Sequence, residues 1–141
     1  MTKWEHYALD LVHAGILEID PINGFIYRIS KNDMYGTPEK LKERRLISPK
    51  MAGKYLAISF NNTFTERKTK NVRVHRLVWM AYNGLIPEGM QINHINTNKM
   101  DNSLVNLELT TPKENVQHSI KHGLQWWQKN LTVSRYSKTV L

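Results

Sequence analysis

The sequence predicts an α+β fold, in which a small N-terminal antiparallel sheet precedes a strand–strand–helix module. Short β-prone runs separated by turn residues occupy the first half of the chain, which is typical of antiparallel strands. Two further short runs and a well-capped helical pattern follow in the second half. The 141 residues, of which 40% are hydrophobic, suffice for a single domain with a modest core.

The N-terminal region, residues 1–73, opens with a helix. Thr2 and Glu5 have the spacing of a capping box, in which each side chain bonds the backbone N–H group of the other residue. Apolar residues then recur at helical spacing up to Gly15, which suits a helix end. We therefore expect an amphipathic helix over residues 3–14.

Strands follow this helix. Residues 16–19 and 25–29 are β-prone and flank the segment Asp-Pro-Ile-Asn-Gly, which predicts a hairpin. Residues 30–43 are polar and contain a glycine and a proline, so we expect a loop there. Further strands are expected at residues 45–48, 55–60 and 71–75. Together these strands predict one small, mostly antiparallel sheet.

The central region, residues 74–123, has a helix, two strands and a second helix. Residues 75–83 place apolar side chains on one face, which predicts a short helix. The strands are expected near residues 90–93 and 107–109. The remaining tail, residues 124–141, has weak periodicity and carries no predicted element.

Local signals mark the start of the second helix in this region. Thr111 can cap it, Pro112 is tolerated at its first position, and Glu114 completes a capping box. Gly123 can end the helix.

The composition favours a nucleic-acid partner. The formal net charge is +8 and the isoelectric point is near 9.8, which favours an anionic partner. A basic membrane-surface protein would need a long basic amphipathic helix, and no segment has that character. The chain has no cysteine, which excludes disulfides, cysteine-ligated zinc and a cysteine nucleophile. Because the sequence has no signal-peptide pattern and no membrane-spanning apolar run, we expect a soluble, cytoplasmic protein.

The second half also contains a pattern that suits phosphodiester hydrolysis. This reaction needs an activated water and stabilisation of charge at the phosphate. A histidine at the end of a strand, such as His94, can activate water because its ordinary pKa is close to neutral. Asn115 and His118 lie three positions apart on the predicted helix, so they share a face. A divalent cation bound there and at Asn93 could stabilise the charge.

An asparagine-rich loop joins the two predicted strands. Residues 96–102 are too rich in Asn and Asp for a helix interior, because these side chains bond their own backbone and form turns. Asn102 and Asn106 therefore have a structural explanation. We expect Asn106 to tie the loop to the first strand and to keep His94 aligned. His75 is also expected to have a structural role.

These motifs resemble the HNH, or ββα-metal, endonucleases, and within them the branch found in phage and intron homing endonucleases. The resemblance rests on the order of His94, Asn106 and the Asn115/His118 helix, together with Val74-His75-Arg76-Leu77-Val78, Asn98-Lys99 and Asn106-Leu107-Glu108. It implies metal-dependent cleavage of double-stranded DNA, with His94 as general base, Asn106 as structural support and Asn115 as a metal ligand. His118 is a second candidate ligand, because related nucleases place histidine on this helix.

The resemblance also implies how DNA would be cut. A single active site per chain would nick one strand and leave 5′-phosphate and 3′-hydroxyl ends. A double-strand break would require a dimer or two successive nicks, and the sequence leaves the oligomeric state open. The expected setting is the cytoplasm of a bacterial or phage-infected cell.

One position departs from this family. An aspartate that binds the metal often precedes the general-base histidine, whereas this sequence has Asn93, whose carboxamide brings no negative charge. Either Asn93 is a weak ligand helped by His118, or the site is impaired and the protein is an HNH-like nucleic-acid-binding module. A metal-stabilised interaction protein is a further alternative, but the sequence lacks the four-ligand set of a structural zinc site. We expect Mg²⁺ at the site, with Mn²⁺ as the next choice, while two imidazoles would also admit Zn²⁺ or Ni²⁺.

Clusters of basic residues are expected to contact DNA phosphates, which makes binding salt-dependent. Most belong to the N-terminal region, which we expect to grip the DNA, and two lysines flank the candidate site. The residues are Arg44, Arg45, Arg67, Lys68, Lys70, Arg73, Lys113 and Lys121. The strand pair around Arg67–Arg73 could enter a groove as a β-ribbon.

Overall fold

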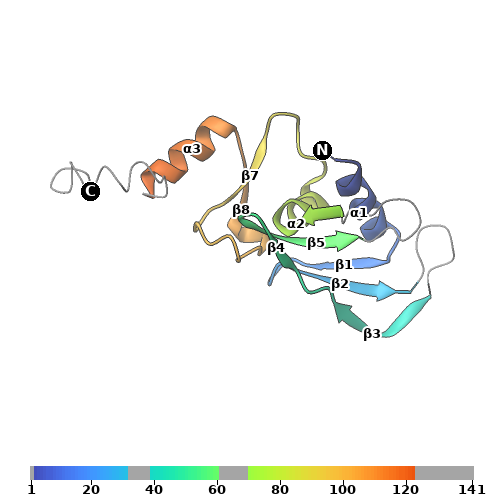
Figure 1. Cartoon of the computed structure of the whole chain (residues 1–141). Helices are drawn as coiled ribbons and strands as arrows, with labels where there is room; N and C mark the ends of the chain where they lie inside the picture. Colours follow the sequence, from blue (N-terminus) through green and yellow to red (C-terminus); the bar gives the residue numbers. More distant parts are fainter. Residues whose placement is uncertain (1, 32–38, 61–69, 123–141) are drawn as a thin grey trace.

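The computed structural model describes residues 2–31, 39–60 and 70–122, which form helices and short antiparallel strands (Figure 1). In chain order the elements are α1 (Lys3–His13), β1 (Leu17–Asp20), β2 (Phe25–Ser30), β3 (Lys40–Leu46), β4 (Lys50–Ala52), β5 (Tyr55–Phe60), β6 (Lys70–Arg73), α2 (Val74–Asn83), β7 (Gln91–His94), β8 (Leu107–Thr110) and α3 (Pro112–Lys121). A 3₁₀ turn, Leu104–Asn106, leads into β8. The expected α+β class is confirmed.

The strands form three antiparallel sheets, in the orders β1-β2-β3, β4-β5-β6 and β7-β8. Where the sequence predicts one N-terminal sheet, the first six strands thus form two. The loop expected over residues 30–43 is partly wrong, because β3 begins at Lys40. β3 is an edge strand whose side chains are almost all exposed and mostly charged, so it lacks the alternating hydrophobic pattern that reveals a strand. The short strand β4 was not predicted. The strand predicted over residues 71–75 ends at Arg73, because α2 begins at Val74.

The core lies where α1 and α2 pack against each other and against the strands (Figure 1). Leu11 of α1, Leu77 of α2 and Ile58 of β5 are buried in one hydrophobic cluster. Burial of each such side chain contributes about 1.5–3 kcal/mol to stability. A salt bridge of 2.8 Å between Arg76 and Glu5 also joins the two helices, and both side chains are largely shielded from solvent. None of the described helices is long and apolar enough to cross a membrane.

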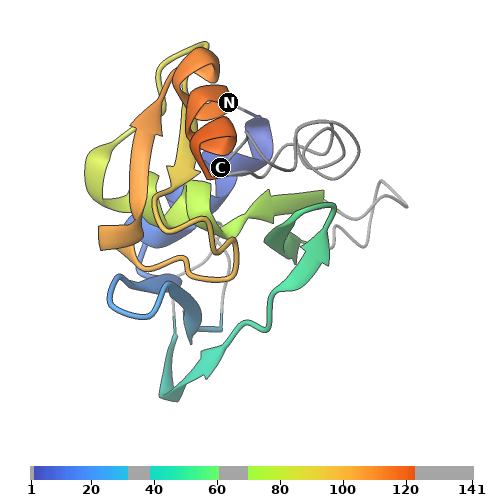
Figure 2. The same ribbon diagram turned by 90° about the vertical axis from the view of Figure 1, so that its left-hand side faces the viewer.

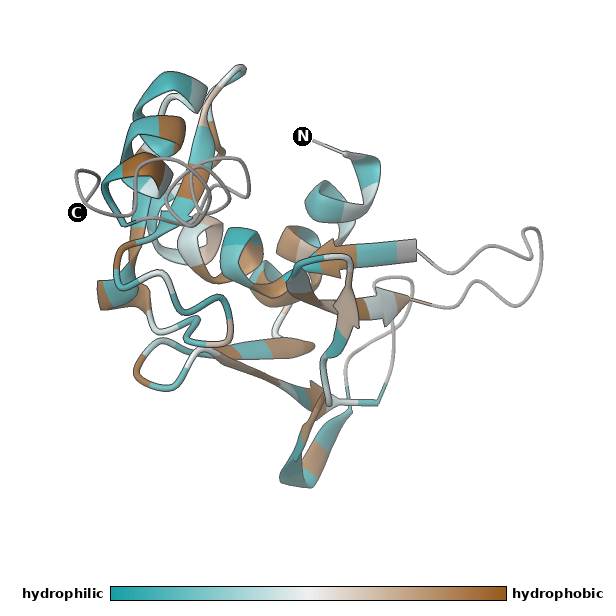
Figure 3. Ribbon diagram, turned by 60° about the vertical axis from the view of Figure 1, so that its left-hand side comes forward, coloured by the Kyte–Doolittle hydropathy of each residue, from teal (hydrophilic) through white to brown (hydrophobic). Residues whose placement is uncertain are grey.

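β7, β8 and α3 form the expected strand–strand–helix unit (Figure 2). The two strands pair so that Asn93 lies opposite Glu108 and His94 lies opposite Leu107. α3 contacts both strands and starts at the predicted capping box of Thr111. None of its residues is buried, and its surface is mainly hydrophilic (Figure 3). Contacts with the hairpin, rather than a core of its own, therefore hold α3 in place.

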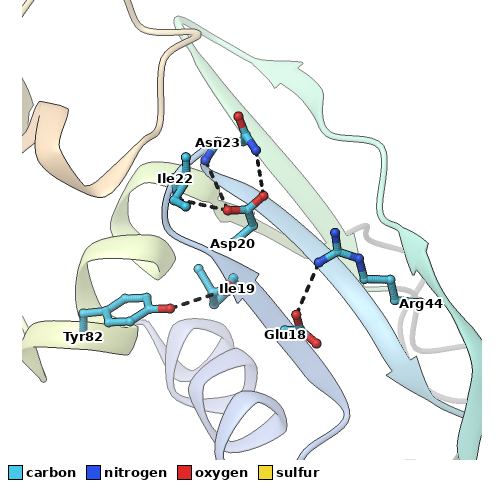
Figure 4. A network of polar contacts seen from close by, with 7 residues as sticks. All are labelled: Glu18, Ile19, Asp20, Ile22, Asn23, Arg44 and Tyr82. Atoms are coloured by element: carbon cyan, nitrogen blue, oxygen red, sulfur yellow. Dashed lines mark hydrogen bonds and ion pairs between the residues drawn. The ribbon is translucent and has the colours of Figure 1, made fainter.

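The turn between β1 and β2 is internally braced. The Asp20 carboxylate accepts hydrogen bonds from the backbone N–H groups of Ile22 and Asn23 and from the side-chain amide of Asn23 (Figure 4). These bonds, above all the one from the Asn23 side chain, lower the pKa of Asp20. Arg44 of β3 pairs with Glu18 of β1 at 3.3 Å in the same network.

This turn also supports the loop that precedes β8. The backbone N–H group of Leu104 donates to the carbonyl of Pro21 at 2.9 Å. Gly24 has a positive φ of 71°, and a Cβ atom at that position would collide with the backbone of Asn102. The N-terminal hairpin and the loop after β7 are therefore packed backbone to backbone.

Candidate active site

A cavity of about 160 Å³ lies between β7, α3 and the turn that joins β4 to β5. Its wall includes residues identified from the sequence, namely Asn93, His94, Asn115 and His118. The strand thus places two of them, and one face of α3 places the other two, around one space. Lys54, Tyr55 and Lys99 also line the cavity.

His94 is the last residue of β7, and only 4% of its surface is exposed. Its Nε2 atom lies 2.7 Å from the side-chain oxygen of Asn102. An amide oxygen only accepts hydrogen bonds, so Nε2 carries a proton and Nδ1 of the neutral ring keeps a free lone pair. Burial lowers the pKa of His94, an effect that the bond to Asn102 partly opposes. The ring is therefore neutral at neutral pH and can accept a proton.

Two other rings hold the imidazole of His94 in place. The ring centroid of His75 is 4.9 Å from that of His94 and 4.8 Å from that of Tyr55. The rings of Tyr55 and His94 are themselves nearly parallel, with centroids 6.0 Å apart. His75 is almost fully buried, and burial, together with the nearby His94, lowers the pKa of His75 to about 3. His75 is thus a neutral packing residue in this cluster of rings.

The two candidate asparagine ligands have their nitrogen ends occupied. Nδ2 of Asn93 donates to Oε1 of Glu108 at 3.0 Å, and Nδ2 of Asn115 donates to Oε1 of Gln91 at 2.7 Å. A carboxylate only accepts, so the orientation of the Asn93 amide is fixed. The oxygen ends of both amides are left for a ligand in the cavity.

His118 offers one more ligand atom. Its Nε2 atom lies 3.0 Å from the carbonyl oxygen of Ile95, which can only accept, so Nδ1 is the nitrogen with a free lone pair. In the described part of the chain, no group of three or more His, Cys, Asp or Glu side chains could hold a metal ion. Amide oxygens, one imidazole and water are nonetheless ligands that a hydrated Mg²⁺ or Mn²⁺ accepts, so these residues fit such an ion.

Asn106 lies beside the cavity rather than in its wall, and it ties the loop after β7 together. Its side-chain oxygen accepts from the backbone N–H group of Asn96 at 2.9 Å, and its Nδ2 atom donates to the carbonyl of Asp101 at 2.8 Å. The backbone carbonyl of Asn106 also accepts from Ile95 at 2.8 Å. This geometry is that of a loop support, because each bond goes to the backbone.

The segment that contains this site matches a known protein family. Residues 72–117, which contain β7, β8 and most of α3, match the family model described as HNH endonuclease. We call this segment, which is similar to HNH endonucleases, the HNH module. The resemblance stated from the motifs is therefore confirmed.

Relatives of this HNH module occur in phages and a giant virus. A protein of Bacillus subtilis with the name "SPbeta prophage-derived putative HNH homing endonuclease YosQ" is 48% identical over 62 residues, which cover 44% of this chain and 36% of the relative. An uncharacterized HNH endonuclease of Acanthamoeba polyphaga mimivirus is 30% identical over 121 residues, with 84% of this chain and 29% of that protein covered. Protein 3.8 of Escherichia phage T7 is 50% identical over 46 residues, with 33% of this chain and 38% of that protein covered. The chain thus spans about a third of the length of these relatives.

A solved structure shares the fold beyond the HNH module. The structure described as DNA binding and cleavage by the HNH homing endonuclease I-HmuI matches with a TM-score of 0.57 and 23% identity. The match covers 86% of this chain and 61% of that chain. The likeness therefore extends to the N-terminal sheets, and at this identity it concerns the fold alone.

The predicted DNA contacts on β3 lie outside the cavity wall. Arg44 and Arg45 are both exposed. The Arg44 guanidinium lies 4.0 Å from the ring centroid of Tyr27 and pairs with Glu18. Stacking on an aromatic ring holds the guanidinium in place while leaving it accessible to a phosphate.

Three other predicted DNA contacts, Arg73, Lys113 and Lys121, lie within or next to the HNH module. Arg73 ends β6, and its guanidinium lies 4.8 Å from the ring centroid of Tyr55 in the cavity wall. Lys113 and Lys121 are exposed on α3. Predictions that fall outside the described residues are those for Arg67, Lys68 and the side chain of Lys70.

The structure adds residues to which the sequence analysis gave no role at the site. Lys54 and Lys99 bring positive charge to the cavity wall. Tyr55 reaches the site from a different sheet, so no local sequence signal could have revealed it. Glu108 lies opposite Asn93 in the hairpin, and Gln91 accepts a hydrogen bond from Asn115 of α3. These two partners could have been found only with the register of the hairpin and the position of α3.

Proposed function

We propose that this protein is a metal-dependent endonuclease that hydrolyses phosphodiester bonds of double-stranded DNA, with His94 as the general base. The observation that carries this proposal is the bond between Nε2 of His94 and Asn102, which leaves the lone pair of Nδ1 free in a residue that lines a cavity with Asn93, Asn115 and His118. A buried, neutral imidazole held in one orientation is what a general base for water requires.

In the proposed reaction, Nδ1 of His94 takes a proton from a water molecule while the oxygen of that water attacks the scissile phosphorus. The bond from phosphorus to the 3′ oxygen breaks, and the departing oxygen takes a proton from solvent. The products carry a 5′-phosphate and a 3′-hydroxyl. Asn102 keeps the ring from rotating, because its oxygen accepts the hydrogen bond from Nε2–H throughout.

Asn93, Asn115 and His118 would hold the divalent cation through two amide oxygens and Nδ1 of the imidazole. When bound, the ion supplies Lewis-acid stabilisation of charge at the phosphate and at the leaving oxygen. We propose Mg²⁺, with Mn²⁺ as a substitute, since hard oxygen ligands and water favour these ions over Zn²⁺ or Ni²⁺.

DNA binding is assigned to two surfaces. Lys54 and Lys99 line the cavity and are placed to contact the phosphates next to the cut. We propose that residues 1–73 hold the flanking duplex, with Arg44 and Arg45 on β3 among the contacts, while residues 74–123 cut it. One such site nicks one strand, in the cytoplasm of a bacterial or phage-infected cell.

A catalytically impaired DNA-binding protein is the second candidate. The observation that favours it is Asn93, which brings no charge to a position where an aspartate would bind the metal more tightly. Such a protein would bind DNA with the same salt dependence but would not cut it.

A plasmid assay separates these candidates. Supercoiled DNA is incubated with the protein and Mg²⁺ or Mn²⁺, with a parallel sample in EDTA. The endonuclease predicts that open circles accumulate before linear DNA, only in the samples with metal, and that DNA ligase reseals the nicks because they carry 5′-phosphate and 3′-hydroxyl ends. Retained DNA binding without metal-dependent nicking, on plasmids of varied sequence, would instead establish the impaired protein.

A further inference from the structure

Glu108 is the cross-strand partner of Asn93 and holds its amide. The two residues face each other in the register of β7 and β8, and Nδ2 of Asn93 lies 3.0 Å from Oε1 of Glu108. Asn93 is only 8% exposed and lines the cavity. Because the carboxylate can only accept, the amide nitrogen must point to Glu108 and the amide oxygen must point away from it.

The charge of Glu108 has no cationic partner in the described part of the chain. Two other glutamates there are neutralised: Glu5 pairs with Arg76 and Glu18 pairs with Arg44. For Glu108 the amide of Asn93 is the side-chain partner, and no lysine or arginine of the described residues forms an ion pair with it. Its negative charge therefore acts on the Asn93 side of the cavity without being cancelled locally.

We propose that Glu108 is a positioning residue that supplies, through the Asn93 amide, the negative charge that an aspartate ligand would carry itself. The proposal rests on the proposed function, since it concerns the metal bound at that site. A carboxylate that accepts from an amide N–H group forms a charge-assisted hydrogen bond and shifts electron density toward the amide oxygen. The oxygen that faces the metal thus becomes a better ligand, and the charge lies one residue behind it.

This arrangement makes a specific prediction for the charge at residue 93. In Asn93→Asp, a second carboxylate would lie within hydrogen-bond distance of Glu108, and the two like charges would repel. Adding the family's aspartate alone should therefore strengthen metal binding little or weaken it. In the double variant Asn93→Asp/Glu108→Gln, the carboxylate is at residue 93, where it can bind the metal, and the neutral amide is at residue 108. The two residues exchange their groups, so a carboxylate again accepts a hydrogen bond from an amide.

Affinity for Mn²⁺ tests the proposal without relying on cleavage. The dissociation constant of Mn²⁺ is measured by electron paramagnetic resonance of the free ion on the full chain, for wild type, Glu108→Gln, Asn93→Asp and the double variant. Glu108→Gln has the same size and keeps an acceptor for Asn93, so it removes only the charge. Glu88→Gln, an exposed residue before β7, removes the same charge elsewhere and serves as the control.

The proposal predicts that Glu108→Gln weakens Mn²⁺ binding by about 10- to 100-fold, the usual effect of outer partners of metal ligands. Glu88→Gln should bind Mn²⁺ as wild type does, and the double variant should recover most of the affinity lost in Glu108→Gln. Wild-type affinity in Glu108→Gln, with unfolding curves that match wild type, would overturn the proposal.

The same titrations separate this proposal from the proposed function. If wild type nicks DNA with Mg²⁺ but Glu108→Gln keeps its Mn²⁺ affinity, the role of Glu108 is refuted and the endonuclease stands. If wild type binds Mn²⁺ in a Glu108-dependent manner but cuts no DNA, the endonuclease is refuted and the role of Glu108 stands. A wild-type chain that binds no Mn²⁺ would overturn both.

Discussion

The side-chain oxygen of Asn102 lies 2.7 Å from Nε2 of His94, and the backbone of Asn102 is packed against Gly24 of the β1–β2 turn. The orientation of the proposed base thus depends on a loop residue, and the position of that loop depends on a hairpin far earlier in the chain. This contact explains how the N-terminal sheets and the HNH module can act as one structure.

Substitution of Asn102 should change both the rate and its pH dependence. Asn102→Ala removes the acceptor for Nε2, so we expect nicking to fall by about 10- to 100-fold, as for other residues that orient a functional side chain. In wild type, burial lowers the pKa of His94, so the rate should stay constant through neutral pH and decline only below the ordinary histidine value of about 6.5.

Asn102→Asp places a negative charge beside Nε2 and should raise the pKa of His94. The decline in rate should then begin at higher pH, because a base must be deprotonated to accept a proton. The pH–rate profile of nicking at saturating Mg²⁺ measures both effects. Profiles of the two variants that superimpose on the wild-type curve would rule out a role for Asn102 in orienting the base.

Gly24→Ala should destabilise the fold more than the same change at Gly53. Both glycines have a positive φ, of 71° and 69°, so both substitutions incur the backbone strain of about 1–2 kcal/mol. Only at Gly24 would the new Cβ atom also meet the backbone of Asn102, whereas the space around Gly53 is open. Urea unfolding of the two variants measures the difference. Equal losses of stability would show that the hairpin and the loop are not tightly packed.

Lys54 and Lys99 should contribute to DNA binding through phosphate contacts. The logarithm of the DNA association constant falls linearly with the logarithm of the salt concentration. Replacing either lysine by alanine should make this slope less steep by about one unit, because one fewer counterion is released. Gln117→Ala, at an exposed and uncharged position of α3 outside the cavity wall, should leave the slope unchanged and serves as the control. Fluorescence anisotropy with a DNA duplex at several salt concentrations measures these slopes. Slopes equal to wild type for both lysines would place the scissile phosphate elsewhere.

His75 should make the stability of the fold depend on pH. Its pKa is about 3 in the folded protein, against about 6.5 in an unfolded chain, so the unfolded chain binds more protons between these values. The stability from His75 is therefore fully present above pH 6.5 and is lost as the pH falls toward 3. From pH 7 to pH 5 the loss should be about 2 kcal/mol.

His75→Phe keeps a ring in the cluster and removes the titration. Its free energy of unfolding in urea should therefore depend less on pH than that of wild type over this range. An identical pH dependence in the two proteins would mean that His75 is readily protonated in the fold.

The elements of this fold that could be predicted from sequence are those set by local rules. The capping boxes at Thr2 and Thr111 depend on residues three positions apart, so the starts of α1 and α3 were predicted correctly. β3 and β4 depend on pairing with distant strands, and the exposed, charged β3 carries no hydrophobic periodicity. The division of the strands into two sheets was for the same reason not predictable.

Only part of the site could be predicted from the sequence, and the reason is physical. His94, Asn115 and His118 belong to one motif, and helical spacing alone puts the last two on one face. Asn102, the partner of His94, depends on a loop conformation, and Glu108, the partner of Asn93, depends on a strand register. The residue types reveal neither. For that reason the sequence showed only that Asn93 brings no negative charge to the site, while the structure shows the Glu108 carboxylate beside it.

The rate of plasmid nicking by His94→Ala is the measurement that tests the proposed mechanism most directly. Wild type, His94→Ala and the control Gln117→Ala, at an exposed position of α3 outside the cavity wall, are compared in Mg²⁺ and in Mn²⁺ after circular dichroism has established that all three are folded. Loss of the general base should reduce the rate of His94→Ala by about 10²- to 10⁴-fold, while DNA binding and the Gln117→Ala rate stay close to wild type. A folded His94→Ala that nicks DNA at the wild-type rate would contradict the proposed role of His94.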